Sequence, residues 1–409
     1  VLNSYATGRV SGQDDVGGLV GYNYDGSSIS NSYATGSITG TDATGGLVGK
    51  NQFASIAESY ASGLVSGHYR AGGLVGQNRD GGTISNSQAL GNVNGYYGVG
   101  GLVGANQEVL TAVFGYGGVI DNDNGTSRIS NSYATGNVVG TNSVGGLVGL
   151  NDSEISINFI DNVTISNSTR TVDIRNSYAT GTVHGDENVG GLVGLNRSTL
   201  AVTGSSGSSI TSSESVASIN KSYATGAVTI TSSGRVGGLL GVNQNSNNTN
   251  GNASSASVDQ SYATGSVSGD TFFAGGLIGQ NDGGTVTSSF WDIDTTGQLI
   301  SAGSDASYGK TTAELLMKST YTDTGWDFTV DINNPNNAGT WFMIDGETRP
   351  FLQSEYSTSI TNSHQLQLMA MDSTANYTLA NNINMAAEFN KLSGMWATDT
   401  GTPSGRGFV

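Results

Sequence analysis

The chain has 409 residues, of which 63 are glycine, 3 are proline and none is cysteine, and its formal net charge is −17. With 15 Lys and Arg residues it offers no basic stripe, which disfavours nucleic acid and anionic membrane surfaces as partners. The lack of cysteine excludes a small disulfide scaffold. No apolar run approaches the roughly 20 residues of a membrane helix, so we expect no membrane insertion.

One two-part phrase occurs eight times between residues 5 and 281. Its first part is Asn-Ser-Tyr-Ala-Thr-Gly, as in residues 31–36, and its second part is Gly-Gly-Leu-Val-Gly-x-Asn, as in residues 45–51. The Tyr-to-Leu offset is 14 residues in the first six copies, whereas the connection after the closing Asn is 8 residues in one copy and 25 in three others. A rigid half and an elastic half in each unit are typical of a solenoid with loops on one side.

Short stretches of Val, Ile, Thr and Tyr alternate with Ser, Asn and Gly, which indicates short strands and tight turns. We therefore predict an all-β fold, a parallel β-helix of about eight coils that we expect to be right-handed. In the phrase Ser-Tyr-Ala-Thr-Gly-x-Val, alternation predicts that Ser, Ala and Val face inward and that Tyr and Thr face outward. The alternative is that the Tyr residues form a ladder in the core. Three apolar positions per unit predict three short strands per turn.

The Asn that closes each second part is identical in every copy. Because equivalent residues of stacked coils lie about 4.8 Å apart, we expect a ladder of inward amides that satisfies the backbone of a turn. The alternative is that these are turn residues selected for a left-handed backbone. The ladder positions are Asn23, Asn51, Asn78, Asn106, Asn151, Asn196, Asn243 and Asn281.

Three consecutive units carry equal insertions, near residues 107–130, 152–175 and 197–220, and a shorter insertion lies at 244–257. We predict that each of the three folds as a hairpin and that the hairpins stack as a small sheet against the solenoid. They would cover an outward stripe of the Val residues that follow each Leu, namely Val103, Val148 and Val193. Loops on a rigid scaffold commonly bind partners, so this surface is the predicted ligand site, with candidate residues Phe114, Tyr116, Phe159 and Asn162.

The repeat phrase ends at Phe290 and Trp291, where bulky apolar residues enter. An open end of a solenoid exposes unpaired strand edge and core, so we predict that residues 291–352 cap the solenoid formed by residues 1–290.

The phrases Ile-Ser-Asn-Ser-Tyr-Ala-Thr-Gly and Val-Gly-Gly-Leu-Val-Gly resemble the GLUG repeat of large bacterial surface proteins, including filamentous-haemagglutinin-like exoproteins of two-partner secretion. Residues 289–292, 325–328 and 345–352 are similar to the segment that closes such arrays, and residues 353–409 to the lead-in of a further solenoid section. The resemblance implies a secreted or cell-surface adhesin, exported through an outer-membrane β-barrel transporter. It leaves the ligand open and supplies no catalytic residues.

Motifs for metals and cofactors are weak. Asp292 and Asp294 imitate the first half of a calcium loop, but no Glu occurs at the twelfth position, and Asp121 and Asp123 belong to a similar short acidic turn. Structural hydrogen bonding explains both equally well, so calcium is the one cofactor left open. The recurring glycines lack the helix and acidic partner of a nucleotide fingerprint.

The three histidines, His68, His184 and His364, are far apart in sequence and are predicted to be surface or turn residues. Acidic residues such as Asp42 and Glu187 occupy the turn between the two fixed parts, where a solvated loop is expected. We therefore expect no catalytic residues and no enzyme. The leading hypothesis is an adhesive rod that displays loops to a cell-surface glycan, a protein receptor or a biofilm matrix. The alternatives are a polysaccharide-active β-helix, a lyase or a hydrolase, and a structural spacer in a giant surface protein.

Overall fold

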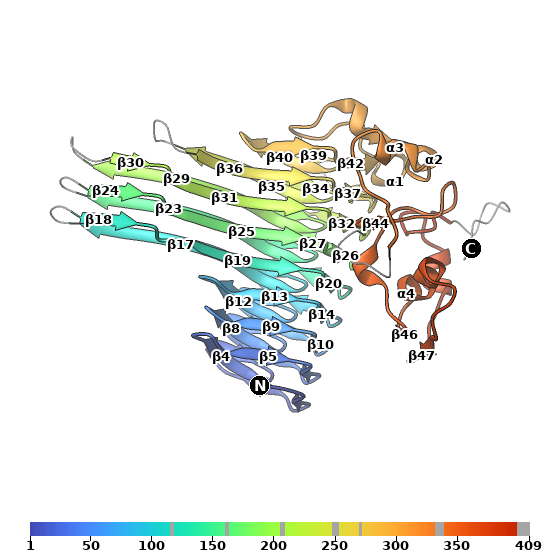
Figure 1. The fold of residues 1–409 in the computed structure, drawn as a ribbon, viewed down its shortest axis with the longest axis horizontal. Coiled ribbons are helices and arrows are strands. Elements are labelled where there is room, and N and C mark those ends of the chain that lie inside the picture. Colours follow the sequence, from blue (N-terminus) through green and yellow to red (C-terminus); the bar gives the residue numbers. More distant parts are fainter. Residues whose placement is uncertain are drawn as a thin grey trace.

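The computed structural model describes residues 1–114, 118–159, 163–204, 209–247, 253–269, 272–331 and 339–398. These residues wind into a parallel β-solenoid, as predicted (Figure 1). Four parallel sheets run along it, so the expectation of three strands per turn is wrong. The fourth sheet arises because the chain between the Thr-Gly of the first part and the paired glycines is itself extended.

The tyrosine sheet and the asparagine sheet carry the two fixed parts of the phrase. The strands of the tyrosine sheet are β1 (Tyr5–Ala6), β6 (Tyr33–Ala34), β10 (Tyr60–Ala61), β14 (Gln88–Ala89), β20 (Tyr133–Ala134), β26 (Tyr178–Ala179), β32 (Tyr223–Ala224), β37 (Tyr262–Ala263), β42 (Phe290–Asp292) and β43 (Gly309–Lys310). The strands of the asparagine sheet are β4 (Val20–Tyr24), β8 (Val48–Gln52), β12 (Val75–Arg79), β17 (Val103–Phe114), β23 (Val148–Phe159), β29 (Val193–Gly204), β35 (Leu240–Asn247) and β40 (Ile278–Asp282).

The valine sheet and the isoleucine sheet complete each coil. The strands of the valine sheet are β2 (Val10–Ser11), β3 (Asp14–Gly17), β7 (Ile38–Gly45), β11 (Val65–Gly72), β15 (Val93–Asn94), β16 (Tyr97–Gly100), β21 (Val138–Val139), β22 (Asn142–Gly145), β27 (Val183–Gly185), β28 (Glu187–Gly190), β33 (Val228–Ile230), β34 (Arg235–Gly237), β38 (Val267–Ser268) and β39 (Phe273–Gly275). The strands of the isoleucine sheet are β5 (Ser28–Ser30), β9 (Ser55–Ala57), β13 (Thr83–Ser85), β19 (Gly125–Ser130), β25 (Thr169–Arg175), β31 (Glu214–Asn220), β36 (Ala253–Asp259) and β41 (Thr285–Thr287).

The remaining elements lie in the insertions and in the C-terminal part. The small sheets are β18 (Gly118–Asp121), β24 (Val163–Ser166) and β30 (Ser209–Thr211); β44 (Trp341–Phe342) and β45 (Phe351–Leu352); and β46 (Ser359–Ile360) and β47 (Thr378–Leu379). The helices are α1 (Ile293–Thr296), α2 (Thr312–Leu315), α3 (Ser319–Thr322), α4 (Ser363–Leu368) and α5 (Ala386–Phe389), with short 3₁₀ turns η1 (Ala306–Tyr308), η3 (Gln353–Glu355) and η4 (Met369–Met371).

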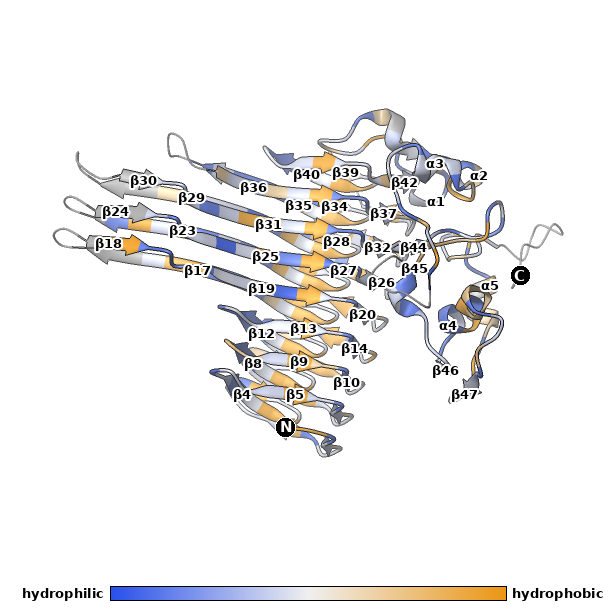
Figure 2. Cartoon of the chain, in the orientation of Figure 1, coloured by the Kyte–Doolittle hydropathy of each residue, from blue (hydrophilic) through white to orange (hydrophobic). Residues whose placement is uncertain are grey.

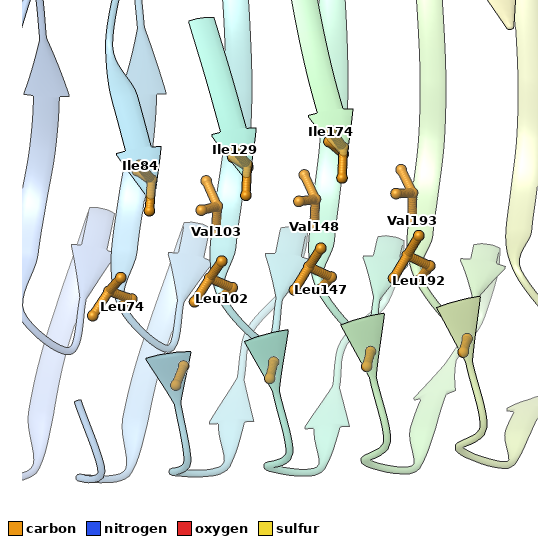
Figure 3. Packing of buried hydrophobic residues seen from close by; sticks show 14 of the residues in the cluster. Leu74, Ile84, Leu102, Val103, Ile129, Leu147, Val148, Ile174, Leu192 and Val193 are labelled. Atoms are coloured by element: carbon orange, nitrogen blue, oxygen red, sulfur yellow. The ribbon is translucent and has the colours of Figure 1, made fainter. Parts of the chain in front are cut away.

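The solenoid core is a set of stacked columns of Leu, Val, Ile and Ala (Figure 3). Leu102 and the next residue, Val103, are both fully buried. The backbone N–H groups of both donate to the carbonyl oxygen of Leu147 in the next coil, at 2.8 and 3.0 Å, because the chain bends here between two sheets. The prediction that Val103, Val148 and Val193 face outward is therefore wrong. Alternation assumes a straight strand, whereas a corner turns both neighbours inward.

Paired glycines make this corner possible. A Cβ atom on Gly100 would lie 2.0 Å from the carbonyl oxygen of Val103, and one on Gly101 would lie 2.0 Å from that of Gly146. Any side chain at these positions would clash with neighbouring backbone atoms, so only glycine fits at both.

The asparagine amides form a continuous ladder inside the solenoid. Each side-chain Nδ2 donates to the Oδ1 of the next coil, from Asn23 to Asn51 at 2.7 Å through to Asn243 and Asn281 at 2.9 Å. From Asn51 to Asn243 these side chains are fully buried. None of the ladder residues has a positive φ, so the alternative of a left-handed turn does not apply to them.

The left-handed corners lie elsewhere, at the residue before each Ser of the first part. This position has a φ of 44° to 50° in every coil, whether it is Asn131, Glu58 or Lys221. The Ser after it builds a second ladder, in which Ser132 Oγ accepts from the N–H of Ser87 at 3.2 Å and donates to the carbonyl of Ser130 at 2.7 Å. The Ser is therefore fixed by two hydrogen bonds at a corner.

The array contains one more rung than the phrase shows. Ser289 Oγ accepts from the N–H of Ser261 at 3.1 Å, and Phe290 and Trp291 pair in register with Tyr262 and Ala263. Trp291 thus replaces a small inward Ala and fills the end of the core. Gly276 N–H then donates to the carbonyl of Ile300 at 2.9 Å, so the chain crosses the last coil.

The three long insertions project from the solenoid as arms (Figure 1). Their outgoing strands β17, β23 and β29 are each 12 residues long and pair in parallel, with Leu110, Ile155 and Leu200 in register. They continue the asparagine sheet outward, and the return strands continue the isoleucine sheet. In the described residues no arm strand pairs with another strand of its own arm, so hairpins lying on the solenoid are the wrong expectation. The predicted stacking side by side is present, and it includes the small sheet β18-β24-β30.

Residues 312–331 and 339–396 form a layer, here called the C-terminal layer, on the outer face of the tyrosine sheet (Figure 1). The most apolar residues of the coils form columns along the sheets (Figure 2) and belong to the solenoid interior, whereas the C-terminal layer packs against the outward rings of Tyr178, Tyr223 and Tyr262. Residues 290–310 lie over the last coil, where Trp291, Ile293 and Tyr308 pack against the core, while the described residues of 312–352 and 353–396 share the same packed cluster. The division of residues 291–352 from residues 353–409 remains a prediction.

Candidate binding surfaces

The tyrosine side chains stack on the outside of the solenoid, as alternation predicts. Ala134 belongs to the core, whereas Tyr178, Tyr223 and Tyr262 belong to the cluster with the C-terminal layer. Neighbouring rings lie 4.8 to 5.2 Å apart between centroids and within 9° of parallel. This spacing follows from the strand spacing of the sheet.

The C-terminal layer covers one half of this stack with specific bonds. Tyr223 Oη donates to Glu355 Oε1 at 2.9 Å, and Tyr262 Oη donates to the carbonyl of Pro350 at 2.7 Å. Burial raises the pKa of both phenols well above the usual value. His364, predicted to be a surface or turn residue, is instead buried, with Nδ1 at 2.6 Å from Glu355 Oε2. A single histidine in a non-repeating segment gave no sequence signal for this contact.

A buried ion pair anchors the layer to the end of the solenoid. Asp292 and Arg349 form this pair, and neither side chain is exposed. Arg349 Nη1 also donates to the carbonyl of Leu392 at 2.9 Å, so one guanidinium joins three segments. Asp292 Oδ1 accepts from the N–H groups of Asp294 and Thr295 and caps α1.

The calcium candidates are occupied by protein groups. The carboxylate of Asp292 bonds Arg349 and the α1 N-terminus, and Asp294 Oδ2 accepts from the N–H of Thr312 at 2.8 Å. In the first arm, hydrogen bonds from Ser166 and Asn167 lower the pKa of Asp121, and Asp123 pairs with Arg170 at 2.7 Å. Among the residues that the structure describes, no group of three or more His, Asp or Glu side chains could hold a metal ion.

The predicted ligand residues of the arms cannot all be placed. Tyr116 and Asn162 lie outside the described residues, and so do the side chains of Phe114 and Phe159. The backbone does place Phe114 opposite Phe159 in the register of β17 and β23. The predicted site therefore lies toward the outer ends of these two strands.

The interior of the arms is partly polar. Ser153 Oγ donates to the carbonyl of Arg170 at 2.7 Å, and Ser198 Oγ donates to Ser215 Oγ at 3.0 Å. Glu108 is fully buried, accepts from Ser127 Oγ at 2.7 Å, and lies 3.6 Å from Arg170 Nη1. Burial raises the pKa of Glu108.

Grooves flank the coils on different faces. The first, here called the break groove, has a volume of about 490 Å³ and lies where Gln88 interrupts the tyrosine stack. The second, here called the arm-root groove, has a volume of about 510 Å³ and lies between the valine sheet and the arms. Its charged lining consists of Asp42, Arg70, Asp152, Glu154 and Arg197.

In the arm-root groove two carboxylates are held by arginines. Arg70 Nε donates to Asp42 Oδ1 at 2.8 Å, and Arg197 donates through two nitrogens to both oxygens of Asp152 at 2.8 Å. Bidentate pairing of this kind is strong and directional. Position-by-position alignment of the repeats could have found these pairs, since each joins equivalent or neighbouring positions of successive coils.

In-register coils, stacked amide and hydroxyl ladders and projecting arms define a parallel β-solenoid protein. The family model described as the GLUG motif matches residues 12–39 and 67–94, so these two stretches are similar to that motif. A putative Gly-rich membrane protein of Evansella cellulosilytica is 40% identical over 109 residues, which are 25% of this chain and 11% of that protein. The chain thus matches about a tenth of the length of that relative. No solved structure matches.

Neither comparison extends to filamentous-haemagglutinin-like exoproteins, so two-partner secretion remains a prediction. Among the described residues, the helices are too short and too polar to cross a membrane.

Proposed function

We propose that this protein is a secreted or cell-surface adhesive rod without catalytic activity. The coils supply stiffness, and the arms meet a cell-surface glycan or protein receptor. A surface repeat protein is consistent with the GLUG repeats and with the relative described as a putative membrane protein. Export through an outer-membrane β-barrel transporter is part of the same proposal and rests on the resemblance of the repeats.

The observation that carries the proposal is the in-register stacking of the three arms. Eleven residue pairs join β17 to β23, and eleven join β23 to β29, from the coil to the outer ends of the strands. Such a platform holds its outer ends at fixed spacing, because each arm is bonded along its length to the next. Rigid display lowers the entropy that is lost when a partner binds.

The arms can be removed without disturbing the coils. Residues 107–130, 152–175 and 197–220 would each be replaced by the short connection of the third coil, residues 79–85. This connection joins the same two sheets, β12 to β13, so the fold should persist. We expect β-sheet circular dichroism to be retained and attachment to host cells or matrix to be lost.

A matched control keeps all arms and changes an exposed aromatic side chain on a coil, Tyr24→Ala. Attachment should survive in this variant. Attachment that also survives arm removal, in a folded protein, would place the adhesive surface elsewhere.

The arm-root groove supports a second candidate, a polysaccharide-active enzyme. It brings acidic and basic side chains together with Tyr69 and Tyr97 beside one coil face. Its Asp42 and Asp152 carboxylates are engaged by arginines, however, so neither can act as a base without breaking an ion pair. Incubation with polyuronates and neutral glucans would test it, since reducing ends or unsaturated products that disappear in Glu154→Gln would favour the enzyme.

A further inference from the structure

The tyrosine stack is interrupted at one rung. In the fourth coil Gln88 takes the place of Tyr, and Leu90 takes the place of Thr. Tyr33 and Tyr60 stack at 4.9 Å below the break, and Tyr133 and Tyr178 stack at 4.8 Å above it. Gln88 pairs in register with both Tyr60 and Tyr133, so the missing ring leaves their facing surfaces without an aromatic neighbour at that rung.

The size of this slot follows from the sheet. Two strand spacings place the rings of Tyr60 and Tyr133 about 10 Å apart. Carbon atoms in contact lie about 3.5 to 4.0 Å apart, so one saturated six-membered ring fits between two aromatic faces. The flexible side chain of Gln88 now lies there and accepts a hydrogen bond from Tyr133 Oη.

Apart from His364, which contacts Glu355, the groove around the slot has no acidic or basic side chain in its described lining, and it is rich in hydrogen-bonding groups. Its lining includes the amides of Gln88, Asn362 and Asn381 and the hydroxyls of Thr135 and Thr361. None of the described residues that line it is Asp, Glu, Lys or Arg. Burial raises the pKa of Tyr133 to about 12, so its phenol is a neutral donor at neutral pH.

The groove continues along the corners of the coils. A neighbouring hollow of about 740 Å³ shares Tyr60, Gln88 and Asn362 with the break groove. It also presents the corner amides of Asn86 and Asn131 and the carboxylates of Glu58 and Glu355. Each hollow alone falls within the range of about 300 to 1,000 Å³ that ligand sites commonly occupy, so the two together offer room for a short oligomer.

We propose that the break groove binds a neutral polysaccharide, with one pyranose ring packed against Tyr60 and Tyr133 in the slot at Gln88. A pyranose has an apolar C–H face that suits an aromatic ring and a rim of hydroxyls that suits amides and hydroxyls. A polyanion would find no cation in this lining and would meet a chain of net charge −17. This inference deepens the proposed attachment function by naming a ligand class, at a site separate from the arms.

A single substitution can close the slot while improving the repeat. Gln88→Tyr restores the residue found at the equivalent position in the other seven copies. Its ring would stack on Tyr60 and Tyr133 at the spacing of the other rungs, so the variant should fold at least as well as the original chain. Tyr60→Ala removes one wall of the slot, and Tyr24→Ala, an exposed aromatic on another sheet, is the matched control.

The test is calorimetric titration of the full chain with cellohexaose, maltohexaose, laminarihexaose and, as an anionic probe, oligogalacturonate. We expect at least one neutral probe to bind, with affinity reduced at least about tenfold by Gln88→Tyr and by Tyr60→Ala. Tyr24→Ala should bind as the original chain does. The inference is overturned if no neutral probe binds, if oligogalacturonate binds instead, or if Gln88→Tyr binds as tightly as the original chain.

The two proposals fail separately. If removal of the arms abolishes cell attachment but Gln88→Tyr does not change glycan affinity, the adhesive function stands and the break groove does not bind glycan. If the armless chain keeps both glycan binding and attachment, the arm platform is wrong and the groove explains attachment.

Discussion

The two halves of the tyrosine stack share one sequence phrase but have opposite environments. Tyr5 is 65% exposed, whereas Tyr223 and Tyr262 are fully buried. The rungs of Tyr5 and Tyr223 have the same inward Ala, the same Ser corner and the same ring stacking. The repeat therefore determines the conformation of a rung, while distant and non-repeating sequence determines whether the rung is surface or interior.

The largest effect is expected where the covering layer is attached. Arg349→Ala leaves the carboxylate of Asp292 buried without its partner, which should cost about 3 to 5 kcal/mol of unfolding free energy. Urea denaturation followed by tryptophan fluorescence measures it, since Trp326, Trp341 and Trp396 lie in the layer. Without this ion pair the C-terminal layer should detach more readily, so the covered tyrosines should become exposed like those of the open half.

Two companion variants sharpen that measurement. The double variant Asp292→Asn with Arg349→Met removes both charges and should lose less than Arg349→Ala. Arg9→Ala, on an exposed residue of the first coil, should stay within about 0.5 kcal/mol of the original chain. Equal losses in Arg9→Ala and Arg349→Ala would contradict the anchoring role.

A smaller loss of stability is expected when the hydroxyl is removed from a covered tyrosine than when the ion pair is broken, and an equivalent uncovered tyrosine provides the comparison. Tyr223→Phe removes the donor to Glu355 Oε1 in a buried site, which should cost about 1 to 3 kcal/mol. Tyr33→Phe, at the same position of the open half, should change stability by less than about 0.5 kcal/mol. Urea midpoints of the two variants give the comparison, and equal midpoints would show that covering adds nothing at this rung.

The asparagine ladder runs through both halves of the solenoid, so its contribution to stability should not depend on whether the C-terminal layer covers the coil. Asn106→Leu removes one amide from the middle of the ladder and leaves the Oδ1 of Asn151 without its donor. We expect a loss of about 1 to 3 kcal/mol, whereas Asn94→Leu, on the exposed face of β15, should be near neutral. An unchanged urea midpoint in Asn106→Leu would count against the ladder as a stabilising feature.

In the arms, the buried carboxylate of Glu108 should make the stability of the protein depend on pH, with a smaller effect than the substitutions above. The folded-state pKa of Glu108 is raised by burial, so folding favours its protonated form and its ionisation opposes folding. The cost is absent below the unfolded pKa of about 4.3 and is fully present above the folded pKa. Relative to the original chain, Glu108→Gln should therefore gain stability as the pH rises from about 4 to 7.

Urea midpoints across that pH range measure the effect. The matched control is Glu214→Gln, an exposed carboxylate on the return strand of the third arm. A difference between Glu108→Gln and the original chain that stays constant with pH would show that the buried carboxylate keeps its ordinary pKa.

The solenoid fold and the register between its coils could be predicted from the sequence, because the same residues repeated at the same spacing indicate stacked, equivalent positions. The inward Ala134, the outward Tyr133 and the amide of Asn106 all follow from that rule. The alternation rule failed at Val103, because the chain turns a corner there instead of continuing as a straight strand. The number of strands per turn was also wrong, because the extended stretch of the fourth sheet consists largely of Gly and polar residues. Repetition identifies positions that are equivalent, but it does not by itself show where the chain bends.

The binding surfaces were less predictable for a different reason. The contacts of Asp292 with Arg349 and of Tyr223 with Glu355 join residues 57 and 132 positions apart, and each occurs once. The departure at Gln88 was visible in the sequence, but it indicated only that an outward position tolerates change. Its meaning depends on Asn362 and Thr361, which reach the same groove from the C-terminal layer.

Chemical nitration of tyrosine, mapped by mass spectrometry on the native chain, tests the central comparison most directly. The account predicts rapid modification of Tyr5, with Tyr223 and Tyr262 protected until the protein is unfolded in urea. Arg349→Ala should expose these two rings if the ion pair holds the layer in place. Modification of Tyr223 and Tyr262 at the rate of Tyr5 in the native protein would contradict the account, because the two halves of the stack would then be alike.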